Sequence, residues 1–317
     1  MVAKIQPRSS CDKCALDGPF SELVMRTIFV SLVAGFLCIY SAVVLSESEY
    51  AIEPMKDNVY RFTAGNYRSV FMVTDEGVFV TDPITPQAAR WLLSELESRF
   101  NQPVKYMAYS HNHVDHVLGG EVFAEAGAVV VAQELAAEDI SWTRVPTAPA
   151  EITFENFLDI ELGSSTVELR YHGANNGRGS VSMRFLPANV LYVVDWIVLG
   201  RMPYRNLIGY DIHGMIRSTE AVLAGPEFDL FIGGHGQSGK REDVEHYLAY
   251  LKALYAAVRD GMLQGKTLDT LKAEIQLEEF KDLPMYREWL PLNVEGVYKT
   301  LVETSYFNFR PDIDADF

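Results

Sequence analysis

Hydrophobic and polar positions change their spacing along the first half of the chain. Polar and apolar residues alternate at 58–62, and the largely apolar runs at 69–74 and 77–82 are separated by an acidic turn at 75–76, so these segments predict three strands. From Pro86 to Phe100 apolar residues recur at three- and four-residue spacing behind an N-terminal proline, which predicts an amphipathic helix. Short apolar runs at 104–109 and 128–132 predict two buried strands, and we expect a helix between them that ends near Ala126.

The second half repeats this order of strands followed by helices. Residues 157–172 and 179–195 predict four strands in two hairpin-like pairs, and 228–233 predict one more. The pattern has no linker rich in proline or serine between the halves, so we expect one α/β domain of layered sheets over residues 50–310. Helices are expected at 211–223, 241–261, 267–275 and 288–304.

An uncharged, mostly apolar run fills residues 28–45. Basic residues precede the run and acidic residues follow it, so we expect the bulk of the chain to lie outside the cytoplasm. We interpret residues 25–46 as a signal peptide, with a retained membrane anchor as the alternative, and residues 1–24 as a cytoplasmic or untranslated leader. The expected location is therefore periplasmic or secreted, or else anchored through the run. A buried core helix is a third interpretation of the apolar run at 28–45.

Composition restricts the chemistry of the domain. The 317 residues contain 27 Lys and Arg against 43 Asp and Glu, a formal net charge of -16, which argues against a nucleic-acid partner. The three cysteines lie at positions 11, 14 and 38, so the predicted domain contains no thiol. Any metal site in the domain must therefore use histidine and carboxylate ligands.

One loop concentrates such ligands. His111, His113, Asp115 and His116 stand within six residues, directly after a predicted strand and before a predicted helix. Imidazole and carboxylate together suit Zn, Fe or Mn, and loops at strand ends commonly carry sites. His111 and His113, two residues apart, can face one metal, while the adjacent residues Asp115 and His116 face a neighbouring position. A single short loop can thus supply ligands to two metal ions.

This HxHxDH pattern resembles the signature of the metallo-β-lactamase superfamily, and two later residues extend the resemblance. Asp195 ends the apolar strand at 190–194 and matches the aspartate with which the family bridges its metals. His235, in the Gly-Gly-His-Gly sequence at 233–236, matches the family's last histidine. The resemblance covers about residues 58–236. It implies an α/β fold, a four-layer αββα sandwich, to which the later helices are added at the C-terminus.

The chain departs from the family in the loop at 173–180, where the family places the third histidine ligand of its first metal. The position where the family has histidine is occupied by Asn176, and His172 lies four residues earlier. The resemblance places a ligand at Asn176, whereas chemistry alone prefers the imidazole of His172. Either the first metal is held loosely, or His172 swings in, or the site holds one metal. We expect Asn176 to face the site, because an alignment without gaps to Asp195 requires it.

The resemblance also implies a ligand set and a reaction. A metal lowers the pKa of bound water to about 7, and the resulting hydroxide attacks a carbonyl or phosphoryl centre. Asp115 would act in catalysis by orienting this hydroxide. The expected cofactor is zinc, one or two ions, with iron or manganese as alternatives. The first ion would be held by His111, His113 and the position of Asn176, the second by Asp115, His116 and His235, with Asp195 bridging.

We therefore expect a metal-dependent hydrolase acting on a small-molecule ester, lactone, thioester or amide. Asp195 stands where the best-known β-lactam-hydrolysing branch has cysteine, so we do not expect that branch. The weaker candidates for substrate contact are His172, Tyr204 and Arg205. Two alternatives remain: an iron-dependent oxidoreductase of the same fold, and a non-catalytic protein whose first metal site has degraded at Asn176.

Overall fold

The computed structural model describes residues 49–305 of the chain. The leader predicted at 1–24 and the signal peptide or anchor predicted at 25–46 lie outside these residues. Within residues 49–305 no helix combines the length and the apolar character needed to cross a membrane.

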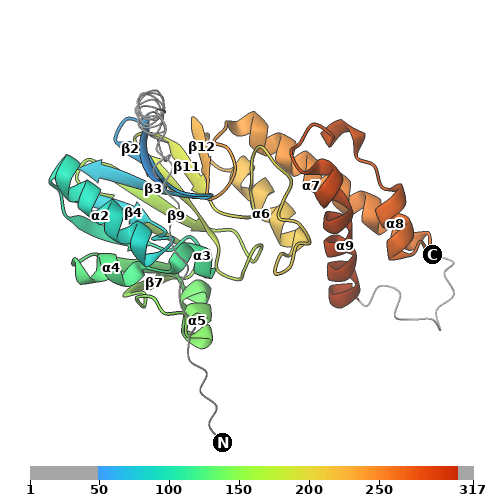
Figure 1. Ribbon diagram of the computed structural model, residues 1–317, viewed down its shortest axis with the longest axis horizontal. Helices are drawn as coiled ribbons and strands as arrows, with labels where there is room; N and C mark the ends of the chain where they lie inside the picture. The colour runs from blue at the N-terminus through green and yellow to red at the C-terminus, as the bar shows by residue number, and fades with distance from the viewer. Residues whose placement is uncertain (1–48, 306–317) are drawn as a thin grey trace, which may run out of the picture. The chain divides into compact units, whose positions relative to one another are not determined.

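Two sheets form the centre of the described part (Figure 1). The first has the order β1-β2-β3-β4-β5-β6-β7 and the second has the order β12-β11-β10-β9-β8. The first sheet comprises β1 (Tyr50–Lys56), β2 (Val59–Ala64), β3 (Tyr67–Thr74), β4 (Gly77–Thr81), β5 (Val104–Ala108), β6 (Val129–Gln133) and β7 (Ile152–Phe154). The second comprises β8 (Phe157–Leu162), β9 (Ser165–Tyr171), β10 (Val181–Leu186), β11 (Val190–Val193) and β12 (Leu230–Gly233).

Side-chain alternation along the strands explains why the sheets stack. Successive side chains of a strand point to opposite faces of its sheet. On β3, Val70 and Met72 pack into the core between the two sheets, while Phe71 packs on the outer side. On β11, Tyr192 faces the same central core and Leu191 faces outward. Both faces of each sheet are therefore apolar, and each outer face needs a layer of helices.

Helices cover both outer faces, which confirms the expected four-layer αββα sandwich (Figure 1). The first sheet packs against α2, α4 and α5, and the second packs against α6 and the C-terminal helices. The helices are α2 (Pro86–Phe100), α3 (Val114–Val117), α4 (Gly120–Glu125), α5 (Glu134–Thr143), α6 (Ile212–Ala224), α7 (Arg241–Leu263), α8 (Leu268–Glu274) and α9 (Tyr286–Ser305), with a 3-10 turn at Glu278–Phe280.

Local structure follows the sequence prediction in most elements and departs from it in four. The helix predicted before Ala126 is two short helices, because Gly119, at φ 97°, breaks the chain between α3 and α4. Strands β1 and β7 and helix α5 were not predicted. The alternation of β1 is obscured by Pro54 and by partly exposed positions, and α5 has only a shallow apolar face.

The loops that carry the candidate site all leave the same ends of neighbouring strands. β4, β5 and β6 are parallel, as are β11 and β12, so their carboxyl ends bring the following loops together. The backbone N–H of Arg68 on β3 donates to the carbonyl of Gly234 after β12 at 2.9 Å, which joins the two sheets beside these loops.

Candidate metal centre

The loop after β5 holds its first histidine through a serine. The backbone N–H of Ser110 donates to Oδ1 of Asp82 at 2.8 Å, which fixes the start of the loop. Its Oγ lies 2.9 Å from Nδ1 of His111. Because Nδ1 is engaged in this way, Nε2 of the buried His111 ring is the nitrogen that faces the site.

The short helix α3 positions the next two ligands. The backbone N–H groups of His116 and Val117 bond to the carbonyl of His113, and the carbonyl of His116 accepts the N–H of Ile84 at 3.0 Å. This turn places the partly exposed Asp115 and the fully buried His116 side by side. Sequence neighbours thus face the same site from adjacent positions.

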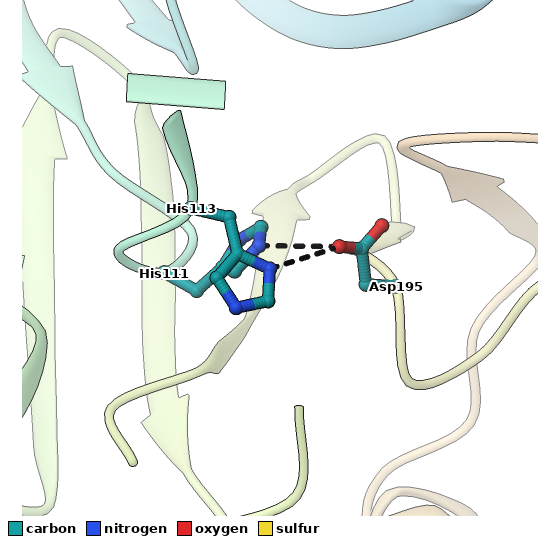
Figure 2. A group of neighbouring side chains, drawn as sticks. All are labelled: His111, His113 and Asp195. Carbon is teal, nitrogen blue, oxygen red and sulfur yellow. Dashed lines mark ion pairs between the residues drawn. The ribbon is translucent and has the colours of Figure 1, made fainter. Parts of the chain in front are cut away.

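Asp195 lies in a strained turn that follows β11. Its φ is 68°, and the N–H of Trp196 donates to the carbonyl of Val194 at 2.8 Å across it. Backbone strain of this kind is often found at functional positions. Figure 2 shows the result: the imidazoles of His111 and His113 both face one carboxylate oxygen. His111 Nε2 lies 3.2 Å and His113 Nδ1 lies 3.6 Å from Oδ2 of Asp195.

The other oxygen of Asp195 faces a second group of ligands. His235 Nε2 lies 3.1 Å and His116 Nε2 lies 3.8 Å from its Oδ1. The two imidazole nitrogens are 3.1 Å apart, and Oδ2 of Asp115 is 3.9 Å from His116 and 3.8 Å from His235. The first triad is His111, His113 and Asp195, and the second triad is Asp115, His116 and His235. Asp195 therefore belongs to the first triad, and its other oxygen faces the second.

The residues present fit a metal. In each triad one donor atom per residue lies within 4.8 Å of the others, which is close enough for all three to bind one ion. Nε2 of His111 and Oδ1 of Asn176 are buried without a hydrogen-bond partner, a costly state that a ligand would relieve. Nitrogen and carboxylate oxygen are the donors that Zn, Fe and Mn accept.

A second carboxylate, Asp82, supports the site from behind. Its Oδ2 lies 3.4 Å from Nδ1 of the fully buried His116 and accepts the hydroxyl of Tyr192 at 2.9 Å. A carboxylate on the far nitrogen of a histidine fixes the ring and makes it a better ligand. The sequence prediction missed Asp82. An aspartate directly after a buried strand was the signal that could have revealed it.

Electrostatics keep both buried carboxylates ionised. Burial raises the pKa of Asp195, but the close contacts with His111, His113 and His235 outweigh it and hold the pKa well below the usual range. Burial likewise raises the pKa of Asp82, and the contact with His116 lowers it more. The site therefore carries concentrated negative charge, which attracts cations although imidazoles surround it.

The histidine nitrogens differ in their protonation. Burial lowers the pKa of His111, so this ring is neutral and its lone pair is free for a ligand. Burial also lowers the pKa of His116, but Asp82 and Asp195 outweigh it and raise the pKa to about 9. A cation that binds at Nε2 of His116 must therefore replace a proton.

Asn176 and His172, the two candidates for the third ligand, lie in different places. The fully buried Asn176 faces the site, where its Nδ2 donates to Oδ2 of Asp195 at 2.8 Å. His172 follows β9, and its Nε2 lies 2.8 Å from Oγ of Ser182 on β10. It lines a separate small hollow beside α6, apart from the two triads.

A cavity of about 690 Å³ opens over the two triads. Tyr204, predicted to contact substrate, lines this cavity, whereas the side chain of Arg205 lies over the Tyr204 ring and is not among the lining residues. Trp289 on α9 also lines the cavity. The sequence prediction did not include two other wall residues, Arg68 on β3 and Arg201 in the loop after β11.

This fold and site define an αββα sandwich with a candidate metal centre. The family comparison agrees: the chain belongs to the metallo-beta-lactamase superfamily, whose model matches residues 63–240. Among characterised proteins, the 2,4-dinitroanisole O-demethylase subunit alpha of Nocardioides sp. (strain JS1661) is 28% identical over 245 residues, 76% of this chain and 71% of that protein.

Solved structures share the fold. The metallo-beta-lactamase from Pontibacter korlensis matches with a TM-score of 0.58 and 18% identity over 64% of this chain and 99% of its own. The DIM-1 metallo-beta-lactamase matches with a TM-score of 0.57 and 18% identity over 64% of this chain and 97% of its own.

Proposed function

We propose that this chain is a metal-dependent hydrolase that directs water onto a small-molecule ester, lactone, thioester or amide. The observation that carries the proposal is the position of Asp195, whose two oxygens face two triads at the floor of an open cavity. Zinc suits these ligands, with iron or manganese as alternatives. When bound, such an ion supplies Lewis acidity and lowers the pKa of water to about 7.

Residues of the chain would position the metal ligands, the attacking water and the substrate. Asp195 would hold the two triads at a fixed separation, and Asp82 would keep the ring of His116 in place. Asp115 has a side chain 39% exposed at the cavity floor, so it can orient the attacking water and accept its proton. The rest of the cavity wall would orient the substrate and limit access of bulk water.

The Nocardioides relative widens the range of substrates to test. That protein is named for removing a methyl group from 2,4-dinitroanisole, an aryl ether activated by nitro groups. We therefore propose activated aryl ethers as further substrates of this chain, because they are also electrophiles that water can attack.

The test uses the full chain purified without chelators. Its metal content is measured, and it is assayed with an ester, a lactone, a thioester, a β-lactam, a phosphodiester and 2,4-dinitroanisole. We expect bound metal and hydrolysis of at least one compound, abolished in His116→Ala. A matched control is His246→Ala, since His246 is exposed and packs on Phe280. Equal loss in both variants, or no hydrolysis by the metal-loaded protein, would contradict the proposal.

One observation favours a second function, an iron-dependent oxidoreductase. Each triad consists of two histidines and one carboxylate, and such a set with open positions is typical of non-haem iron sites that use oxygen. Demethylation of an aryl ether is also compatible with oxidation. Iron as the resident metal, together with oxygen uptake that depends on substrate, would support this function. Zinc with no oxygen uptake would exclude it.

A further inference from the structure

Two arginines line the cavity without an ionic partner. Arg68 and Arg201 both contribute to its wall, and neither guanidinium forms an ion pair with any residue in the part of the chain that the structure describes. Nearby Glu53 is engaged by Arg61 at 2.6 Å. In a chain of net charge -16 with abundant carboxylates, two unpaired cations facing one cavity indicate a site for an anionic group.

Arg68 is held rigidly enough to serve as part of a binding site. Its backbone N–H donates to Gly234, and its carbonyl accepts the hydroxyl of Tyr192 at 3.0 Å. The side chain bonds to the carbonyl of Asn66 at 2.9 Å, and its Nε is buried without a hydrogen-bond partner. A buried N–H of this kind is costly unless a ligand accepts from it.

Arg201 is fixed by an aromatic wall. Its Nη1 donates to the carbonyl of Met202 at 2.9 Å, and the guanidinium lies 5.4 Å from the centre of the Trp289 ring. Tyr204 packs edge-on against the same ring at 5.4 Å between centroids. Trp289 therefore contacts the cation, Tyr204 packs on Trp289, and both rings line the cavity.

Helix α9 fixes this wall from behind. The fully buried Asn293 donates to the carbonyls of Pro203 at 3.2 Å and Arg205 at 2.7 Å, and it accepts the hydroxyl of Tyr250 at 2.6 Å. The aromatic wall thus depends on helices that lie beyond residue 240, where the family match ends. The C-terminal helices therefore supply part of the cavity that the matched segment does not.

We propose that the cavity selects a small aromatic substrate that carries an anionic oxygen group away from the bond that reacts. The anionic group pairs with Arg68 and Arg201, and the ring packs against Tyr204 and Trp289. This assignment of substrate class rests on the proposed function for the reaction itself, but the binding that it describes can be measured without turnover.

The test is calorimetric titration of the metal-loaded full chain with three probes. Benzenesulfonate combines ring and charge, methanesulfonate has the charge alone, and nitrobenzene has a flat ring without net charge. Sulfonates are used because they are weak metal ligands. We expect benzenesulfonate to bind at least about tenfold more tightly than either other probe, since each charged hydrogen bond and the ring contact contribute.

Substitutions in the cavity wall show which side chains cause the preference for benzenesulfonate. Arg201→Gln and Arg68→Gln are each expected to lower the affinity for benzenesulfonate about tenfold and to leave the affinity for nitrobenzene unchanged. Arg68→Lys, which keeps the charge, should retain most of the affinity. Trp289→Leu should lower the affinity for both ring-bearing probes and leave the affinity for methanesulfonate unchanged. The matched control is Arg90→Gln, an exposed cation on α2 away from the cavity, which should change nothing.

Several results would overturn the proposal. These are benzenesulfonate binding no tighter than the other two probes, binding that survives both arginine substitutions, or equal weakening by Arg90→Gln. Hydrolysis of a neutral ester is measured on the same preparation. Its absence would count against the proposed function alone, whereas hydrolysis without preference for the anionic aromatic probe would count against this inference alone.

Discussion

The side-chain amide of Asn176 donates a hydrogen bond of 2.8 Å to Oδ2 of Asp195, the oxygen that also faces His111 and His113. At this position the amide holds the carboxylate, and no third imidazole joins the first triad. The first triad is therefore expected to bind metal more weakly than the second, because an amide is a poorer ligand than imidazole.

Replacing Asn176 with histidine should tighten metal binding at the first triad by about tenfold or more, by analogy with the cost of altering groups around a metal. Competition with a chromogenic chelator would measure the affinity at each site. Asn176→Ala serves as the matched control, since it removes the hydrogen bond without supplying an imidazole. Equal affinities for the histidine variant and the parent would contradict this assignment of Asn176.

Asp82 is predicted to act as a positioning residue for His116. Asp82→Asn should lower metal affinity at the second triad roughly 10–100-fold, since it removes the carboxylate behind the ring. Tyr192→Phe removes the hydroxyl that contacts both Asp82 and the carbonyl of Arg68, and should leave the metal affinity nearly unchanged. Both variants are measured by metal competition and by urea unfolding. An unaltered affinity in Asp82→Asn would show that the contact has no such role.

His172 should make the fold sensitive to mild acid. Burial, and then the charge of Arg170, lower its pKa from 6.5 to about 4. The unfolded chain therefore takes up this proton first, so the contribution of His172 to stability is complete above pH 6.5 and is lost as the pH falls towards 4. The loss amounts to about 3 kcal/mol over that range.

Unfolding free energies of the parent and of His172→Gln, measured between pH 7 and pH 4, would test this expectation. The difference between the two proteins should shrink as the pH falls, because the variant has no imidazole to titrate. His246→Gln, at an exposed position, provides the comparison. A difference that stays constant across the range would be inconsistent with a buried, neutral His172.

Asn293 is expected to matter for stability as well as for the cavity wall. Asn293→Leu would leave the carbonyls of Pro203 and Arg205 and the hydroxyl of Tyr250 without their partner. The expected cost is about 3 kcal/mol in the free energy of unfolding. Gln276→Leu, at an exposed amide of the same layer, should cost little. Urea unfolding measures both, and similar losses would refute the special role of Asn293.

Sequence periodicity predicted the fold well where burial is one-sided. Helix Pro86–Phe100 has a regular apolar face and begins behind Thr85, whose side chain accepts the N–H of Ala88. Strand β1 gave no such signal, because it lies at a sheet edge and contains Pro54. Pattern alone therefore identifies elements whose burial alternates and misses those that a neighbouring strand or layer stabilises.

Only the site residues that belong to short sequence motifs could be predicted. His111 and its neighbours are close in sequence, so their spacing was informative. Arg68 and Arg201 come to the site from a strand and a loop that are distant in sequence, and nothing local distinguishes them. His172 shows the opposite failure, since its nearness to Asn176 in sequence does not bring its ring to the site.

The central claim is that the two triads bind metal, with Asp195 in the first and its other oxygen facing the second. The most direct measurement is the metal content of the purified full chain, combined with its melting temperature before and after chelation. We expect one or two equivalents of zinc, iron or manganese, and a melting temperature that falls on chelation and recovers when metal is restored, because an ion that binds only the folded chain stabilises it. A metal-free protein whose melting curve is unaffected by chelator and by added metal would contradict the claim.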